Sequence, residues 1–224
     1  LIWHGTMRLL DRLSISVNYV NNDSCIDSSI LFIDGGGNFV DYYSDVRDFL
    51  SLKHKKYKEV VILPHTISGE KQKEFLKELG LNVTIFCREE ESFNFIKNHS
   101  DRVQCYLSQD CAFYNDFSEY EKVGTGTLNA FRDDGESIFD KKPIDNIDIS
   151  HDGWCKKPLG DFLEKISNYD EIRTDRLHVA IAGTLLNKKV MLFPNSYYKN
   201  LAVYEYSLKK YPKTVFAHNL LNIL

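Results

Sequence analysis

The stretch VVILPHTISGEKQKEFLKELGLNVTIFC at residues 60–87 decides the fold class of this sequence. It begins with a short apolar run rich in β-branched residues, continues with helical periodicity over 70–79, and ends in a second apolar run at 83–87. Apolar runs of about four to eight residues are typical of buried strands, and Gly80 stands where a helix C-terminal cap is expected. The pattern predicts two parallel strands joined by a crossover helix.

The same alternation extends from this stretch in both directions along the chain. Further strands are predicted at 16–20, 29–33, 103–107, 128–131, 171–173 and 190–193, and further helices at 40–57, 89–98, 161–167, 175–186 and 196–210. Strands that alternate with helices indicate an α/β fold with parallel sheets.

Two segments interrupt this alternation. Between residues 116 and 127 it gives way to polar residues and glycines, which predicts an N-terminal domain at 1–118 and a C-terminal domain at 119–224. The segment 141–160, which holds Trp154 and two prolines, is expected to be a long loop.

Composition narrows the class of protein. The 224 residues include 28 Lys plus Arg and 32 Asp plus Glu, and a formal net charge of -4 argues against nucleic acid or anionic lipid as a partner. No apolar run approaches the ~18 residues of a membrane span, and no signal segment is recognisable, so a soluble cytoplasmic protein is expected. The five cysteines form no C-x-x-C pair, which favours a reducing compartment and no metal site. Because the sequence starts with Leu1 instead of Met, a short N-terminal piece is expected to be missing; the oligomeric state stays open.

Three consecutive glycines, Gly35, Gly36 and Gly37, stand between Asp34 and Asn38 directly after a predicted strand. Glycines let backbone N–H groups approach a ligand at a helix N-terminus, and this run is expected to open the next helix. It matches neither the dinucleotide-binding fingerprint nor the Walker loop. We favour close contact with a ligand over the alternative, a tight strand-to-helix turn that needs positive φ angles.

His65 and Arg88 stand at the ends of the next two predicted strands. Ligands bind at the carboxyl ends of strands in open α/β sheets, which makes both residues candidates for a site. For His65 a role in capping local backbone is about equally favoured, and the sequence does not decide the role of Arg88.

Residues 172–184, IRTDRLHVAIAGT, carry the densest set of candidates. Thr174 or Asp175 is expected to cap a helix that follows a short strand, with Arg176 and His178 in its first turn. A helix N-terminus and a guanidinium group together suit a phosphate or carboxylate, and His178 is placed to move a proton beside it. The alternative is that Arg176 pairs with a neighbouring Asp and His178 is a core residue; the combination favours function.

Arg132, in NAFRDDGE at 129–136, also follows a predicted strand and is a second candidate for binding an anion. Three carboxylates of the same segment, Asp133, Asp134 and Glu136, stand close to it in the sequence, so we expect this arginine to be ion-paired. Taken alone, Arg132 does not identify a site.

The ordered set of these motifs resembles the polysaccharide pyruvyl transferase family. The matching motifs are DGGGN at 34–38, LPHT at 63–66, R-E-x-x-S at 88–92, QDCAF at 109–113, R-x-D-x-E at 132–136, TDRLH at 174–178 and NSYYKN at 195–200. The resemblance covers roughly residues 30 to 200 and implies a GT-B-like architecture, in which two Rossmann-like domains face a cleft. The N-terminal domain is then the acceptor side and the C-terminal domain the phosphoenolpyruvate side.

The resemblance also implies an activity: transfer of pyruvate from phosphoenolpyruvate to two sugar hydroxyls of a polysaccharide or its precursor, as a ketal. Phosphoenolpyruvate is then a co-substrate, no cofactor or metal takes part, and the saccharide acceptor is free or lipid-linked. His178 would be the general acid or base, and Arg132 and Arg176 would hold the donor and stabilise the departing phosphate. The substrate-binding residues it implies are Gly35, Gly36, Gly37, Asn38, His65, Arg88, Asp175, Leu177, Asn195 and Lys199.

Two other classes of protein remain as alternatives. A GT-B glycosyltransferase with a nucleotide-sugar donor would share the architecture, and it would release a nucleotide in place of phosphate. A non-catalytic carbohydrate-binding relative is disfavoured, because the set of arginines and histidine is intact in this sequence.

Overall fold

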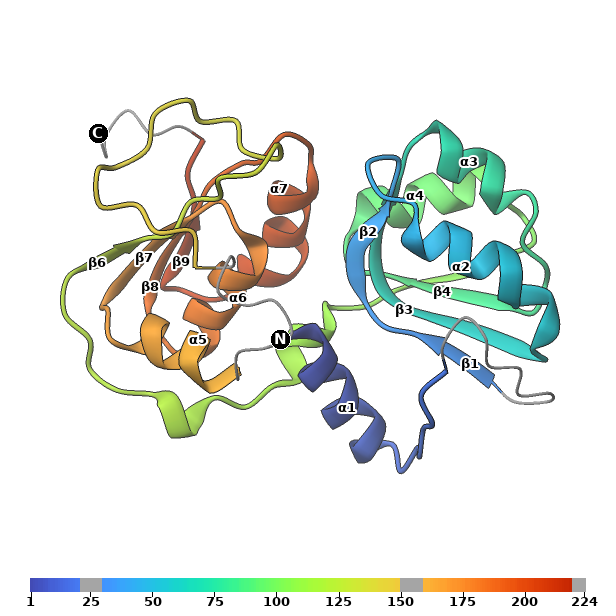
Figure 1. Cartoon of the computed structure of the whole chain (residues 1–224), viewed down its shortest axis with the longest axis horizontal. Helices are drawn as coiled ribbons and strands as arrows, with labels where there is room; N and C mark the ends of the chain where they lie inside the picture. Colours follow the sequence, from blue (N-terminus) through green and yellow to red (C-terminus); the bar gives the residue numbers. More distant parts are fainter. Residues whose placement is uncertain (21–29, 150–158, 219–224) are drawn as a thin grey trace. The chain divides into compact units, whose positions relative to one another are not determined.

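A computed structural model describes residues 1–20, 30–149 and 159–218 of the chain. The chain forms two compact units, one of residues 2–114 and one of residues 115–224 together with Leu1. Each unit contains one parallel β-sheet with helices packed beside it (Figure 1), so the chain is an α/β protein with Rossmann-like units. In the described part of the chain, no helix is long and apolar enough to cross a membrane.

The described strands of the N-terminal unit form a five-stranded parallel sheet of order β1-β3-β4-β5, with β2 also pairing with β3. The elements are α1 (Ile2–Arg12), β1 (Ile30–Ile33), β2 (Gly36–Val40), α2 (Asp45–Lys53), η1 (His54–Lys56), β3 (Glu59–Ser68), α3 (Glu70–Leu76), β4 (Val83–Cys87), α4 (Glu90–His99), β5 (Gln104–Leu107) and η2 (Cys111–Tyr114). Strand β4 buries alternate residues and β3 buries most of its residues, and their apolar side chains share one core with helix residues that include Leu50, Leu76 and Ile96.

Strands β1 and β2 follow one another along the ten-residue strand β3 and pair with it as two parts of one interrupted strand. Strand β1 pairs with residues 59–62 and β2 with residues 65–68, and Asp34 and Gly35 form the interruption. The prediction that the glycine run opens a helix is therefore wrong, since α2 begins only at Asp45. Glycine and asparagine are poor helix formers, and the Phe-Val pair that follows them favours an extended strand.

The backbone of the glycine run is also not a positive-φ turn, because none of Gly35, Gly36 and Gly37 has a positive φ. Space is the constraint at Gly35, where an added Cβ would lie 2.9 Å from the carbonyl oxygen of Pro64. The glycines therefore allow close packing of β2 beside β3.

The other strands and helices predicted for the N-terminal unit have different outcomes. Strand β4 has the predicted bounds, and the strands predicted at 29–33, 60–63 and 103–107 are present with shifted ends, although residue 29 lies outside the described residues. The strand predicted at 16–20 is wrong: the backbone there is irregular and follows α1, which the sequence reading missed. Helix α3 ends at Leu76 with Lys77 as its cap, so Gly80 does not cap it.

Three cysteines are described, and all of them are free and buried. Cys87 and Cys105 lie on neighbouring strands with their Sγ atoms 3.5 Å apart, and both pack as small residues of the core. Cys25 and Cys155 lie outside the described residues.

The described strands of the C-terminal unit form a four-stranded parallel sheet of order β6-β7-β8-β9. The elements are η3 (Ser118–Tyr120), β6 (Thr127–Asn129), α5 (Leu159–Ser167), β7 (Glu171–Thr174), α6 (Leu177–Leu185), β8 (Lys189–Leu192), α7 (Lys199–Val203), the π-helical turn η5 (Tyr204–Leu208) and β9 (Thr214–Phe216). Helix α6 packs closely on β7 and β8, because a Cβ at Gly183 would lie 3.0 Å from Val190 and 3.2 Å from Ile172.

In the C-terminal unit the predicted alternation of strands and helices is confirmed, but several of these elements begin or end at other residues than predicted. Helix α6 begins at Leu177 with Arg176 as its N-cap, so neither of the two preceding residues caps it. The helix predicted at 196–210 is shortened to α7 and its π-helical turn, and β9 was not predicted. Residues 141–149 form a loop as predicted, whereas 150–158, with Trp154, lie outside the described residues and α5 begins at Leu159.

Candidate functional site

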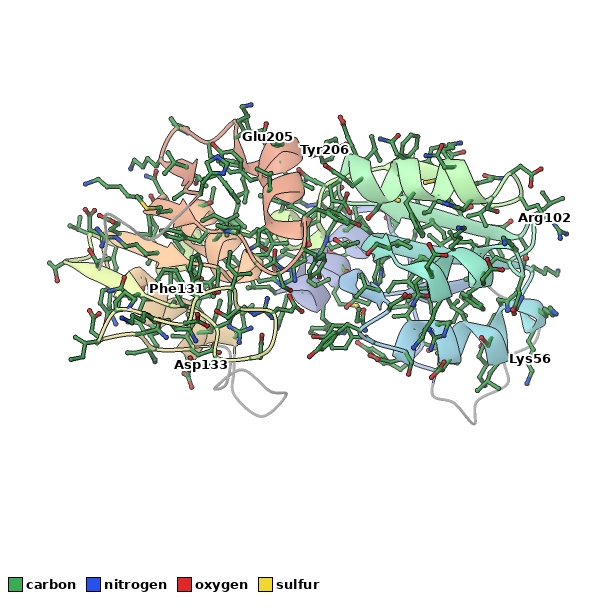
Figure 2. All side chains as sticks on the ribbon, turned by 90° about the horizontal axis from the view of Figure 1, so that it is seen from above. Lys56, Arg102, Phe131, Asp133, Glu205 and Tyr206 are labelled. Atoms are coloured by element: carbon green, nitrogen blue, oxygen red, sulfur yellow. The ribbon has the colours of Figure 1, made fainter. Side chains whose placement is uncertain are left out.

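The C-terminal candidates lie just beyond the carboxyl ends of β6, β7 and β8. Arg132 follows β6, Asp175 and Arg176 follow β7, and Asn195 follows β8. Parallel strands end at one edge of a sheet, so residues distant in the sequence meet there. The backbone N–H of Arg132 donates to Oδ1 of Asp175 at 2.8 Å, which joins the segments after β6 and β7. Figure 2 labels the neighbours of Arg132: Phe131 is fully buried against Phe193, and Asp133 reaches the surface of the unit.

Arg132 is ion-paired, as the sequence predicts. Its Nε and Nη2 atoms donate to the two carboxylate oxygens of Asp134 at 2.7 and 3.1 Å, and its Nη1 donates to Oε2 of Glu136 at 2.5 Å. The same Glu136 oxygen accepts from Nζ of Lys199 at 2.7 Å and from the amide of Asn195 at 3.2 Å. Burial lowers the pKa of Arg132, but its hydrogen bond to Asp134 and the nearby carboxylates outweigh this effect and raise the pKa. Arg132 therefore stays charged.

Arg176 is also ion-paired, which is one of the two interpretations that the sequence leaves open. Its Nε and Nη2 atoms donate hydrogen bonds to the two carboxylate oxygens of Asp148 at 2.6 and 2.5 Å. Asp148 is buried and also accepts from the backbone N–H of Asp133 at 2.8 Å. The sequence reading missed Asp148, because it lies in the long loop outside any motif; its one signal is a carboxylate between two isoleucines.

The two guanidinium groups converge on one oxygen of Asp134. Nη2 of Arg132 and Nη2 of Arg176 donate to its Oδ2 at 3.1 and 3.0 Å, so the two nitrogens lie at most about 6 Å apart. The side chain of Asp134 is 42% exposed. Charged hydrogen bonds from two guanidinium groups to one oxygen are suited to carboxylate or phosphate, and here that oxygen belongs to the protein itself.

Asp175 and Asn200 fix the strand ends that carry these arginines. The amide of Asn200 donates to the backbone oxygens of Asp175 at 2.6 Å and Phe193 at 2.8 Å, and this links the ends of β7 and β8. Burial raises the pKa of Asp175 to about 6. The described contacts of Asp175 are thus with the protein backbone and with the hydroxyl of Ser137, 3.4 Å away.

Leu177 and His178 open helix α6 next to Arg176, and His178 stands in its first turn as predicted. Leu177 is buried, so its side chain serves the core, whereas His178 is half-buried. In the described residues, no group of three or more His, Cys, Asp or Glu side chains is placed to hold a metal ion.

In the N-terminal unit, Gly36, Asn38 and His65 lie together across β2 and β3. Gly36 is the register partner of His65, and Nε2 of His65 lies 3.1 Å from Oδ1 of Asn38. His65 does not end its strand, since β3 continues to Ser68, and its other ring nitrogen lies 2.9 Å from the carbonyl oxygen of Leu63. Its ring is fully buried, and burial lowers its pKa to about 4, which leaves it neutral at pH 7.

Arg88 forms a buried ion pair in the N-terminal unit. Its Nη1 donates to Asp110 at 2.7 Å and its Nε to the hydroxyl of Thr66 at 2.9 Å. These contacts join β3, β4 and the segment after β5. Both charged side chains are almost fully excluded from solvent, so the pair holds the sheet edge together.

The fold, together with Arg132 and Arg176, defines a protein with Rossmann-like α/β units and a charged cluster at the carboxyl ends of the strands of a parallel sheet. A family model described as polysaccharide pyruvyl transferase matches residues 1–197, and the chain belongs to this family. It is thus a transferase of polysaccharide biosynthesis, with a saccharide acceptor indicated by the family.

The chain is also similar to a solved structure, that of a functionally uncharacterized protein from Klebsiella pneumoniae subsp. pneumoniae NTUH-K2044. The two share 31% sequence identity and a TM-score of 0.80, over 97% of this chain and 87% of that one. No curated protein matches the chain.

Proposed function

We propose that the protein transfers pyruvate from phosphoenolpyruvate to two hydroxyls of a saccharide, as a ketal, and releases phosphate. The observation that carries this proposal is the convergence of Arg132 and Arg176 on a single carboxylate oxygen of Asp134. Phosphoenolpyruvate presents a carboxylate and a phosphate, and a pair of planar guanidinium forks suits both groups. In the bound state, oxygens of the donor take the place of the Asp134 carboxylate.

The reaction requires several proton movements beside this site. The methylene carbon of the donor gains a proton, and a saccharide hydroxyl oxygen bonds to the central carbon and loses its proton. The bond from that carbon to the phosphate oxygen breaks, and its electron pair leaves with the phosphate. The second hydroxyl oxygen then bonds to the same carbon and closes the ketal as it loses its proton. Of the two hydroxyl protons released, one replaces the proton that the methylene carbon gained and the other goes to the departing phosphate.

His178 is the residue we assign to this proton transfer. It lies in the first turn of α6, two residues from Arg176, and is half-buried and thus reachable from solvent. Histidine suits both acceptance and donation of a proton near neutral pH, and such a group contributes typically about 10² to 10⁴ in rate. Arg132 and Arg176 stabilise the charge of the departing phosphate.

Family membership supports the remaining parts of the proposal. The two domains adopt a GT-B-like arrangement, and the N-terminal domain binds the saccharide, free or lipid-linked, with Gly35–37, Asn38 and His65 among its candidate contacts. Phosphoenolpyruvate is the co-substrate, and no cofactor or metal takes part. The reaction takes place in the cytoplasm.

Donor binding tests the proposal without knowledge of the acceptor. Phosphoenolpyruvate at 100 times its dissociation constant is expected to raise the free energy of unfolding by about 2.7 kcal/mol, which a thermal melt detects. An Arg132→Gln variant is expected to lose this shift. A wild-type protein that shows no shift and no calorimetric heat with millimolar phosphoenolpyruvate, with or without saccharide, would contradict the proposal.

A further inference from the structure

We propose that Asp134 is a resident counter-ion of the donor site, which every anionic ligand must displace from the two arginines. This inference rests on the proposed function. It assigns to Asp134 a threshold role: displacement of the side chain lowers the affinity of every anionic ligand by the same factor, so a ligand with a single weakly held anionic group does not occupy the site. The carboxylate-plus-phosphate class of donor does occupy it.

Three carboxylates surround the two guanidinium groups, and their burial differs sharply. The side chains of Glu136 and Asp148 are 8% and 1% exposed, whereas that of Asp134 is 42% exposed. Removing a partner from a buried ion pair is strongly destabilising, while a solvent-exposed pair contributes about 1 kcal/mol or less. Asp134 is therefore the carboxylate that leaves at the lowest free-energy cost.

Each arginine keeps a buried partner when Asp134 turns away. Arg132 remains bonded through Nη1 to Glu136, which Lys199 also holds, and Arg176 remains bonded through Nε and Nη2 to Asp148. The guanidinium planes therefore keep their orientation. Nε and Nη2 of Arg132 lose their carboxylate partner, and Nη2 of Arg176 loses one of its two.

The paired charges explain which ligands bind in spite of this displacement. The ion pairs join three cations, Arg132, Arg176 and Lys199, to three anions, Asp134, Glu136 and Asp148, so the charges in these pairs balance while Asp134 is in place. A ligand with one carboxylate only replaces the bonds and the charge that Asp134 supplied. A donor with a second anionic group adds hydrogen bonds that Asp134 did not make, and these offset its displacement.

The same competition acts on the product. Once the phosphate is free, the Asp134 carboxylate, tethered two residues from Arg132, competes for both guanidinium groups at high local concentration. Asp134 therefore weakens phosphate, pyruvate and phosphoenolpyruvate by a common factor. The weakest of these ligands then fills only a negligible fraction of the donor sites. The released phosphate also dissociates faster than it would without Asp134.

Calorimetric titration of Asp134→Asn and Asp134→Ala with inorganic phosphate, pyruvate and phosphoenolpyruvate tests this inference. Asp133→Asn is the matched control, because it removes the same charge one residue away. The Asp133 side chain is 52% exposed and pairs with Lys142, not with either arginine. We expect both Asp134 variants to bind phosphate and phosphoenolpyruvate about fivefold more tightly than the wild type, or about 1 kcal/mol, with the control within about twofold of the wild type.

The outcomes separate this inference from the proposed function. Asp134 variants that bind phosphate as the wild type does, or more weakly, would overturn the counter-ion role while leaving the donor site in place. An equal gain in the Asp133 control would overturn it as well, because net charge alone would then explain the effect. If neither the wild type nor the Asp134 variants bind phosphate or phosphoenolpyruvate, the proposed function fails, and the inference fails with it.

Discussion

Substitution of Arg176 by lysine separates a planar fork from a simple positive charge. Arg176 makes two bonds to the buried Asp148, at 2.6 and 2.5 Å, and one to Asp134 at 3.0 Å. An ammonium group has no fork that can grip both Asp148 oxygens side by side, so about one buried charged bond is lost. Hydrogen bonds to charged groups contribute about 1.5–3 kcal/mol, which predicts a decrease of about 2 kcal/mol in the free energy of unfolding. Affinity for phosphoenolpyruvate should fall by about tenfold or more, because the lysine also lacks the second donor that the ligand requires.

Urea denaturation and calorimetric titration measure the two effects, with Arg173→Lys as the matched control. Arg173 lies on β7, is partly exposed, and its side chain makes a single described hydrogen bond, to Glu171 at 2.5 Å. Its substitution should change stability by less than about 1 kcal/mol and leave donor affinity unchanged. An Arg176→Lys protein as stable as the control, with wild-type affinity for phosphoenolpyruvate, would refute the reasoning.

Three further substitutions test other parts of the account. His178→Gln should lower kcat by about a hundredfold or more while a thermal melt and donor titration stay near wild type; near-normal turnover would remove His178 from the mechanism. His65 has a pKa of about 4 in the fold against about 6.5 when unfolded, so its contribution to stability is complete above pH 6.5 and falls by about 3 kcal/mol as the pH drops to 4. Urea melts at pH 7 and pH 4.5 should show less of this loss in His65→Gln, and an unaltered pH dependence would count against it. Asp110→Asn leaves Arg88 buried without its counter-ion and should cost about 3 kcal/mol or more, whereas Glu74→Gln, on the surface, should change the urea midpoint little; equal effects would contradict the burial argument.

The sequence predicts the sheets well because the pattern of apolar runs is local. Strand β4 has its predicted bounds, and the alternation of strands and helices holds in both units. The glycine run was misread as a helix start because its partner is distant: Gly36 pairs with His65, and no local period reveals that pairing. The low helix propensity of these residues predicts the observed structure better, since three glycines and an asparagine disfavour a helix.

The candidate site also has one part that the sequence predicts and another part that depends on contacts distant in the sequence. Placing Arg132 and Arg176 at strand ends needed only the strand assignments, because parallel strands end at one edge of a sheet. Their ion partners were harder to predict. Asp134 and Glu136 lie within the motif of Arg132, but Asp148 reaches Arg176 from a loop 28 residues earlier in the chain, which depends on tertiary folding.

Turnover of phosphoenolpyruvate in deuterium oxide, with a panel of hexosides as acceptors, tests the central claim most directly. Phosphate is measured as it is released, and the saccharide product is examined by mass spectrometry and NMR. The account predicts one phosphate for each ketal formed, no release without saccharide, and one deuterium in the new methyl group, because the methylene carbon takes its proton from an exchangeable group. Phosphate release that does not depend on saccharide, or a saccharide product that carries no pyruvate, would contradict it.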